Sequence, residues 1–305
     1  MMPTLASILH VLLALLLAPL LLGVINRTKA KFAGRHGQPY LQSYYDLIKL
    51  LRKGAVYSRT TTWVFRAGPM IALAAVLIAL AVVPLGGVPA LAAFPGDLIV
   101  LAYVLGLARF MTVLAALDTG SAFEGMGASR EVQFSLLCEP ALLLGLAALA
   151  ICTQSLDLSN IYGDLFQASL VRVEPAAILV AGAFLMVLLA ENARIPVDDP
   201  NTHLELTMIH EVMVLDHGGV DFAFIQYGAA LKLWVFSALL VGVALPLRTH
   251  QPLLDLLAGV GGVFAVAIIV GIVESTMARL RLLNVPQMLV AASALAITAL
   301  FWILR

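Results

Sequence analysis

The chain has 305 residues, of which 62% are hydrophobic and only 12% are charged, and its formal net charge at pH 7 is zero. Its mean hydropathy is +1.00, which excludes a water-soluble domain because no soluble core of this size needs so much apolar surface. The apolar stretches have the length of about 20 residues that a helix needs to cross a bilayer, and they lack the alternating pattern of membrane barrel strands. The sequence therefore predicts an all-α, polytopic integral membrane protein.

Eight apolar stretches predict eight membrane-spanning helices within a single membrane domain, residues 1–305. The first stretch is expected to be a retained span, because no basic residue precedes its apolar core and no small-residue cleavage site follows it. The predicted spans are residues 3–25, 66–85, 97–117, 131–153, 174–191, 225–247, 253–275 and 287–304.

The distribution of basic residues predicts the orientation of these spans. Nine of the 18 Lys and Arg residues lie between Arg27 and Arg66, and four more follow on the same side at Arg130, Arg194, Arg279 and Arg281. The opposite side receives only three. By the positive-inside rule, the loops at about 26–65, 118–130, 192–224 and 276–286 face the cytoplasm, and both termini lie outside.

Within the first loop, residues 41–51 predict an amphipathic helix that lies in the headgroup plane. Apolar residues stand at positions 41, 44, 47, 48 and 51, which is a helical spacing, and Gly34, Gly37 and Pro39 interrupt the chain before it. Two roles remain open for this helix. It is either a lipid-facing element or the wall of a cavity that opens to the cytoplasmic side.

Cys138 and Cys152 are the only cysteines. Two thiols from one chain cannot hold an iron–sulfur cluster or a structural zinc ion, and both are interpreted as small buried apolar residues. No cofactor is therefore expected in this chain, and a redox cofactor would belong to a partner.

Four ionisable side chains fall within or at the end of predicted spans: Arg109, Glu139, Lys232 and Glu274. A charge in a span is energetically unfavourable and usually points toward a partner or toward water. Glu131 and Glu139 are on one helix face, which favours a proton relay over a single carboxyl held near Pro140. For Lys232, a relay role and a structural counter-charge are equally compatible with the pattern.

The segment 191–217, ENARIPVDDPNTHLELTMIHEVMVLDH, is rich in carboxylates and is either a docking loop or the opening of a proton path. Thr202 followed by Glu205 has capping-box spacing, so a helix is expected to begin at 202. On that helix, His203, His210 and Glu211 would form part of a polar stripe along a hydrated cavity. A zinc protease motif is not expected, since Val214 stands where the second histidine would be.

Four segments in the same order resemble one protein family. They are GRHGQPYLQSYYDLIKLL (34–51), LDTGSAFEGMGASREVQFSLLCEP (117–140), ENARIPVD (191–198) and ESTMARLRL (274–282). The chain is similar, end to end, to the membrane subunit shared by respiratory complex I, where it forms the quinone site, and by the group 4 membrane-bound nickel–iron hydrogenases. The LDTGS, GASRE and EP matches resemble the formate hydrogenlyase subunit 4 and hydrogenase-4 component C branch in particular.

The resemblance implies a non-catalytic subunit that leads protons from a redox site into the membrane. The family usually has glutamates where this chain has Asn201 and His203, and a Glu-Tyr pair in the His210–Glu211 region, so histidines would replace carboxylates here. The candidate proton-path residues are Glu131, Glu139, Glu191, Asp198, His203, Glu205, His210, Glu211, Lys232 and Glu274. The candidate loop-anchoring or ion-pairing residues are Arg109, Arg130, Arg194 and Arg279.

The resemblance implies two partners on the cytoplasmic side of a prokaryotic inner membrane, a small iron–sulfur subunit and a large subunit. In true hydrogenases the large subunit contains a nickel–iron site. Antiporter-like membrane subunits and the lipid bilayer are also implied, and nucleic acid is not. The alternative function is the quinone-site subunit of a complex I type dehydrogenase. A stand-alone secondary transporter is disfavoured, because the sequence has no inverted repeat.

Overall fold

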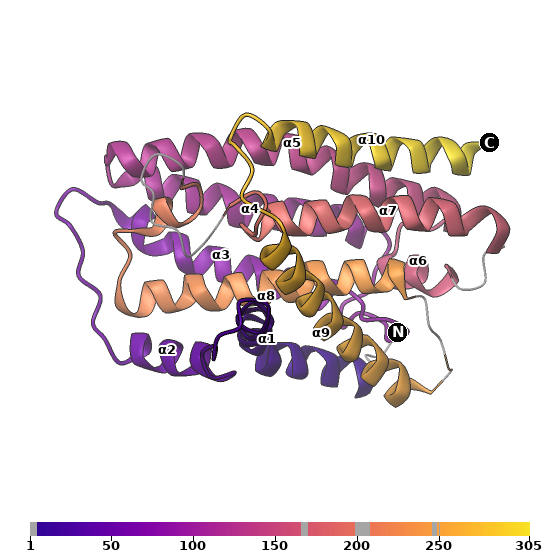
Figure 1. Ribbon diagram of the computed structural model, residues 1–305, viewed down its shortest axis with the longest axis horizontal. Helices are drawn as coiled ribbons and strands as arrows, with labels where there is room; N and C mark the ends of the chain where they lie inside the picture. The colour runs from indigo at the N-terminus through magenta and orange to yellow at the C-terminus, as the bar shows by residue number, and fades with distance from the viewer. Residues whose placement is uncertain (1–4, 166–169, 199–207, 246–248, 250) are drawn as a thin grey trace.

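The structure is a computed structural model that describes residues 5–165, 170–198, 208–245, 249 and 251–305. Within these ranges, eight long helices form the body of the molecule (Figure 1). They are α1 (Leu5–Phe32), α3 (Trp63–Val82), α4 (Asp97–Asp118), α5 (Ala122–Thr153), α7 (Leu170–Glu191), α8 (Gly219–Ala244), α9 (Pro252–Thr276) and α10 (Val285–Leu304). Three short helices complete the described part: α2 (Gln42–Leu51), α6 (Leu158–Asp164) and the 3₁₀ turn η1 (Glu211–Val214).

Seven of the long helices are long and apolar enough to cross a membrane, and an apolar stretch at Pro175–Glu191 of α7 is shorter. Most long helices run side by side along the long axis of the molecule, while α9 crosses them obliquely (Figure 1). The start of α1 and the end of α10 lie on the side of the molecule away from α2 (Figure 1). The predicted all-α, polytopic membrane fold is confirmed.

Several helix boundaries differ from the predicted spans. Helix α1 continues to Phe32, which places Lys29 on a helix rather than in a loop. Helix α5 begins at Ala122, so most of the predicted loop 118–130 is helical. Its 32 residues correspond to about 48 Å, well beyond the bilayer core of about 30 Å, and its polar first turns project from the apolar region.

Helix α8 forms the centre of the bundle. It packs against α1, α3, α7 and α9, and 78% of its apolar window is buried inside the protein. A helix that is hydrophobic on all sides is stable in such a position because neighbouring helices cover every face. Lys232 is therefore carried into the interior of the molecule, near the middle of α8, because this helix begins before the predicted span 225–247.

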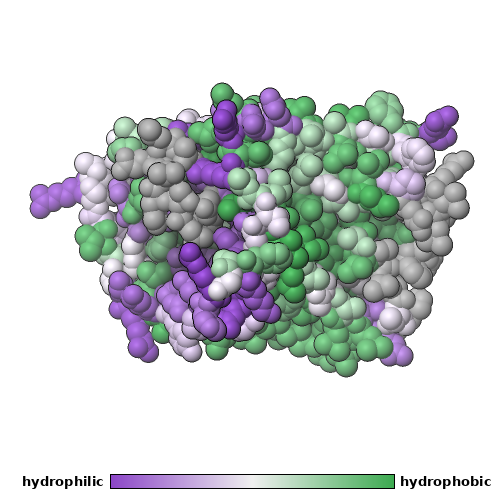
Figure 2. Space-filling view, viewed as in Figure 1, coloured by the Kyte–Doolittle hydropathy of each residue, from purple (hydrophilic) through white to green (hydrophobic). Residues whose placement is uncertain are grey.

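Helix α2 lies against α1 and α8 at the end of the molecule opposite the ends of the chain. Its apolar residues Tyr45, Ile48 and Leu51 are exposed, as is Leu41 just before it. Hydrophilic side chains gather around α2 on the face shown in Figure 2, whereas the opposite part of that face is mainly hydrophobic. This arrangement is that of an amphipathic helix at the edge of a bilayer.

Candidate functional site

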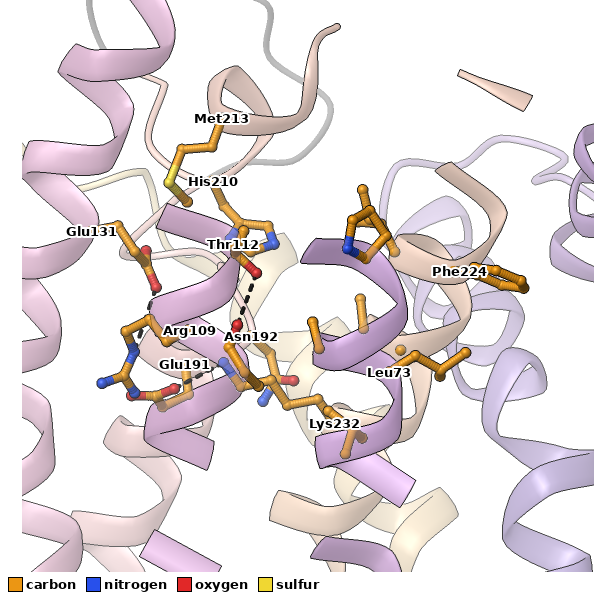
Figure 3. A pocket seen from close by; sticks show the side chains of 17 residues that line it. Leu73, Arg109, Thr112, Glu131, Glu191, Asn192, His210, Met213, Phe224 and Lys232 are labelled. Atoms are coloured by element: carbon orange, nitrogen blue, oxygen red, sulfur yellow. Dashed lines mark hydrogen bonds and ion pairs between the residues drawn. The ribbon is translucent and has the colours of Figure 1, made fainter. Parts of the chain in front are cut away.

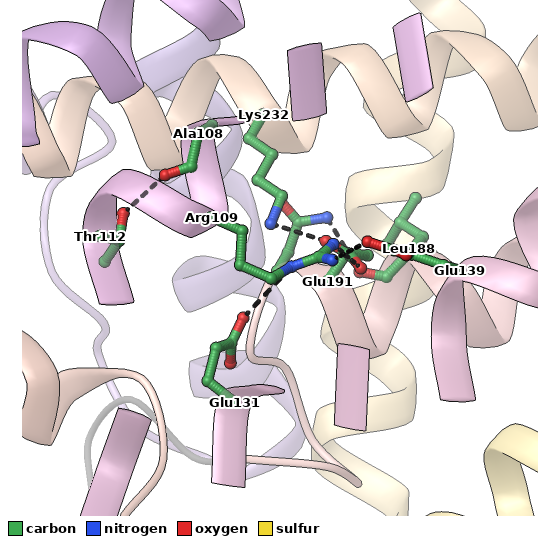
Figure 4. A network of polar contacts seen from close by, with 9 residues as sticks. Ala108, Arg109, Thr112, Glu131, Glu139, Leu188, Glu191 and Lys232 are labelled. Atoms are coloured by element: carbon green, nitrogen blue, oxygen red, sulfur yellow. Dashed lines mark hydrogen bonds and ion pairs between the residues drawn. The ribbon is translucent and has the colours of Figure 1, made fainter. Parts of the chain in front are cut away.

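Arg109 of α4 lies at the centre of a group of charged residues within the bundle (Figure 4). Its Nη2 binds Glu191 Oε1 at 2.6 Å, its Nη1 binds the Glu139 carboxylate, and its Nε lies 3.9 Å from Glu131 Oε1. Lys232 Nζ binds the other oxygen of Glu191 at 2.8 Å. We call these five residues the Arg109 network.

Four different helices contribute to the Arg109 network: α4, α5, α7 and α8. Glu131 and Glu139 reach the same arginine because they lie two helical turns apart on one face of α5. Helix α5 is continuous through Pro140. The side chain of Glu191 is only 5% exposed, whereas that of Glu139 is 47% exposed.

The network has an unequal balance of formal charge. Three carboxylates face two cations, so the group has a formal charge of −1 when all five are ionised. Uptake of one proton would make it neutral. These ion pairs join four helices, with Glu191 at the end of α7 and with Arg109 and Lys232 near the middle of α4 and α8.

A second set of ion pairs anchors the end of α9. Glu274, whose side chain is fully buried, binds Lys29 Nζ at 2.8 Å and contacts Arg194 Nη1 at 3.4 Å. Lys29 was placed among the loop cations by the sequence analysis, and the continuation of α1 to Phe32 brings it to Glu274. The stretch from Ile25 to Phe32 contains no glycine or proline, and this was the signal that could have revealed the longer helix.

Asp198 anchors the segment that follows α7. Its Oδ1 accepts a hydrogen bond from Arg279 Nη2 at 2.7 Å, and its Oδ2 accepts the backbone N–H groups of Ile209 and His210 at 3.3 and 3.2 Å. Arg130 on α5 donates to the backbone carbonyl of Met208 at 2.8 Å. These contacts fix residues 208–210 against both α5 and the segment that joins α9 to α10.

The helix expected to begin at residue 202 is not formed over residues 208–210, which are irregular, and only the 3₁₀ turn η1 follows. The Asp198 and Arg130 contacts satisfy backbone groups that a helix would otherwise pair. Met208 and Ile209 are buried, while His210 and Glu211 are half-buried. His203 and Glu205 lie outside the described residues.

In the part of the chain that the structure describes, residues of the Arg109 network line a pocket and a groove, and a further cavity lies beyond His210. A pocket of about 100 Å³ is lined by Arg109, Glu131, Glu191 and Lys232 of the network and by His210 (Figure 3). A cavity of about 390 Å³ lies between α1, α2, α8 and the segment after α7. A groove of about 600 Å³ opens between α4 and α5, and Glu139, Glu191 and Arg109 lie along it among apolar side chains.

Next to these cavities, His217 stacks on Phe65 with ring centroids 3.9 Å apart and an angle of 6° between the planes. Burial lowers the pKa of His217 below its usual range, although Asp221 and Asp216 act in the opposite direction. Burial raises the pKa of Tyr57, and Asp221 adds to this effect. His217 and Tyr57 were not predicted, and they secure the start of α8 against α3.

Among the residues that the structure describes, no group of three or more His, Cys, Asp or Glu side chains could hold a metal ion. Cys138 is buried and Cys152 is half-buried, and both are free thiols.

A model of the NADH dehydrogenase family matches residues 5–304 of the chain. The chain belongs to this family. It is 32% identical over 305 residues to formate hydrogenlyase subunit 4 of Escherichia coli K12, covering 98% of each chain. It is 31% identical over 296 residues to hydrogenase-4 component C of the same organism, covering 95% of this chain and 92% of the relative.

The similarity to an NADH-quinone oxidoreductase subunit of Anaplasma phagocytophilum is lower, at 27% identity over 69% of this chain and 66% of the relative. The predicted resemblance and its closer relation to the hydrogenase branch are confirmed. The fold is also that of a chain in the membrane-bound sulfane sulfur reductase, an archaeal respiratory membrane complex. That chain superposes with a TM-score of 0.81 at 22% identity, covering 97% of this chain and 98% of the other.

Proposed function

We propose that this chain is the membrane subunit of a hydrogenase-like, complex I-related oxidoreductase, and that it couples electron transfer in partner subunits to proton movement. The names of its relatives, formate hydrogenlyase subunit 4 and hydrogenase-4 component C, support membership of such a complex. The observation that carries the coupling role is the Arg109 network, with three carboxylates and two cations in the interior of the bundle. In this proposal, the chain itself transfers no electrons.

The end of the molecule that contains α2 is the proposed docking surface for a small iron–sulfur subunit and a large subunit on the cytoplasmic side. Basic residues concentrate there, and the segment after α7 is joined to the α9–α10 connection by the hydrogen bond from Leu280 N–H to the carbonyl of Pro196 at 2.9 Å. Iron–sulfur clusters, with or without a nickel–iron site, belong to those partners. The proposed location is a prokaryotic inner membrane with both termini outside.

The groove between α4 and α5 is the proposed contact for an antiporter-like membrane subunit. The side chain of Glu139 is 47% exposed there, next to the exposed rings of Tyr103 and Phe110. A half-exposed carboxylate facing lipid in mid-membrane is unfavourable, and a polar group on a neighbouring membrane helix would relieve this cost.

Glu191 provides the direct test. Inverted membrane vesicles that contain the assembled complex are supplied with reduced methyl viologen as electron donor, and with medium protons or added polysulfide as acceptor. Proton movement is followed with an acid-sensitive dye. We expect Glu191→Gln to abolish proton translocation while donor oxidation continues, because the carboxylate that joins Arg109 to Lys232 is removed.

Asp164→Asn is the matched control, since Asp164 is exposed at the end of α6, a helix that contributes no residue to the network. It should translocate protons at the unmodified rate. Normal translocation by Glu191→Gln would contradict the proposed coupling role of the network.

The quinone-site alternative is favoured by one observation. The cavity of about 390 Å³ between α1, α2 and α8 has the size of a small-molecule site. Inhibition of donor oxidation in the same vesicles by quinone-site inhibitors would support this second function, and insensitivity would exclude it.

A further inference from the structure

His210 separates the two cavities that lie on either side of the segment after α7. Four residues line both the cavity of about 390 Å³ and the pocket of about 100 Å³: Asn192, His210, Ile225 and Ala229. Of these four, His210 alone has an ionisable side chain. Its imidazole is directed into the smaller pocket, beside Thr112 (Figure 3).

The backbone at His210 is held in a fixed position. Its N–H donates to Asp198 Oδ2 at 3.2 Å, and Asp198 is in turn bound by Arg279. Helix α5 approaches the same segment closely at Gly127, where an added Cβ would lie 2.9 Å from the carbonyl oxygen of Ile209. The backbone is thus anchored on two sides, while the side chain is half-buried between two spaces.

The charged groups around His210 differ between the two spaces. In the smaller pocket they are those of the Arg109 network: Arg109 of α4, Glu131 of α5, Glu191 of α7 and Lys232 of α8. In the larger cavity they are Asp46 of α2, Arg194, Asp198 and Glu211. Glu211 lines only the larger cavity, so it cannot replace His210 as a connection between them.

We propose that His210 is the proton-relay residue between the larger cavity and the Arg109 network. One ring nitrogen accepts a proton from water in the larger cavity, and the other ring nitrogen gives up its proton, through water in the smaller pocket, to the carboxylate of Glu131 or Glu191. One proton enters and one leaves, and no group is oxidised or reduced. A pocket of about 100 Å³ has room for more than one water molecule, each of which occupies about 30 Å³ in the liquid.

A competing connection runs through Asp198, which lines the larger cavity and a small pocket of about 20 Å³ that also touches Glu131 and Glu191. The Asp198 carboxylate is occupied by Arg279 and by the N–H groups of Ile209 and His210. Taking up a proton there would disrupt contacts that fix the segment. The imidazole ring of His210 can rotate and exchange protons without breaking these backbone contacts.

This inference rests on the proposed function, and the same vesicle assay tests it with His210→Ala. We expect the rate of proton translocation to fall at least about 100-fold, the lower end of the range for loss of a positioned acid–base group. Added imidazole, a small base that can enter the larger cavity, should restore a substantial part of that rate. Asp164→Asn, the control used for Glu191→Gln, should leave translocation unchanged and insensitive to imidazole.

The relay would be overturned if His210→Ala translocated protons at the unmodified rate. It would also be overturned if imidazole did not restore the rate that His210→Ala loses. If Glu191→Gln stops translocation in that same experiment, only the assignment of His210 fails and the proposed function stands. If Glu191→Gln is also without effect, the proposed function itself fails. Loss of the assembled complex with both His210→Ala and the conservative His210→Gln would assign His210 a structural role and likewise reject the relay.

Discussion

Arg109 illustrates why arginine, and not lysine, suits the centre of the network. The guanidinium presents donors in several directions, so one side chain reaches Glu131, Glu139 and Glu191 at the same time. Lys232, with a single ammonium group, is paired in this network only with Glu191. The sequence predicted that each of these residues was significant, because charges in spans are rare. It could not predict the pairing, since 82 residues separate Arg109 from Glu191.

Arg109→Lys tests this geometric requirement at constant charge. Each charge-assisted hydrogen bond that is lost should cost on the order of 2 kcal/mol, and a lysine cannot retain contacts with all three carboxylates. We expect a lower apparent melting temperature of the purified complex and impaired proton translocation. Arg281→Lys, at an exposed position, is the control and should change neither quantity. Equal thermal stability of the two variants would show that the forked geometry of Arg109 is not needed.

At the scale of the elements, the length of the apolar runs predicts the helices. It does not predict the conformation of the segment after α7. Long runs of apolar residues locate the spans, because a helix in lipid must satisfy its own backbone, although α1 and α5 continue beyond the predicted bounds into polar sequence. Residues 208–210 have helical sequence spacing but are irregular, since Asp198 and Arg130 bind their backbone groups. Such long-range contacts leave no periodic signal. This is why the candidate histidine was identified from the sequence while its conformation was not.

Gly127 on α5 allows this segment to lie against the helix. An added Cβ would be 2.2 Å from Val212 Cγ1, closer than atoms can pack, and 2.9 Å from a backbone oxygen of Ile209. We expect Gly127→Ala to destabilise the purified complex by about 1–3 kcal/mol through overpacking. Gly125→Ala is a close control in the same helix, because nothing lies within 4 Å of its added Cβ, and it should be neutral or stabilising by up to about 1 kcal/mol. The comparison is made by thermal unfolding, and a Gly127→Ala variant as stable as Gly125→Ala would contradict the close packing.

At the scale of the whole molecule, the described helices separate two ends of different chemistry. The start of α1 and the end of α10 lie on the side of the molecule away from α2, and hydrophilic side chains gather around α2 (Figures 1 and 2). This arrangement agrees with an even number of crossings, as eight predicted spans require. The number of basic residues on each side predicts the direction of insertion, because cytoplasmic loops retain an excess of Lys and Arg.

Two single cysteines test the direction of insertion. Ser58→Cys lies on the exposed connection between α2 and α3, and Gln251→Cys is exposed just before α9 at the opposite end. A membrane-impermeant maleimide should label Ser58→Cys in inverted vesicles only, and Gln251→Cys in right-side-out vesicles only. The unsubstituted chain provides the background, since Cys138 is buried and Cys152 lies near the end of α5. The reverse pattern would place the Asp198 segment and the larger cavity on the outer side, where neither cytoplasmic redox subunits nor a proton supply from the cytoplasm could reach His210.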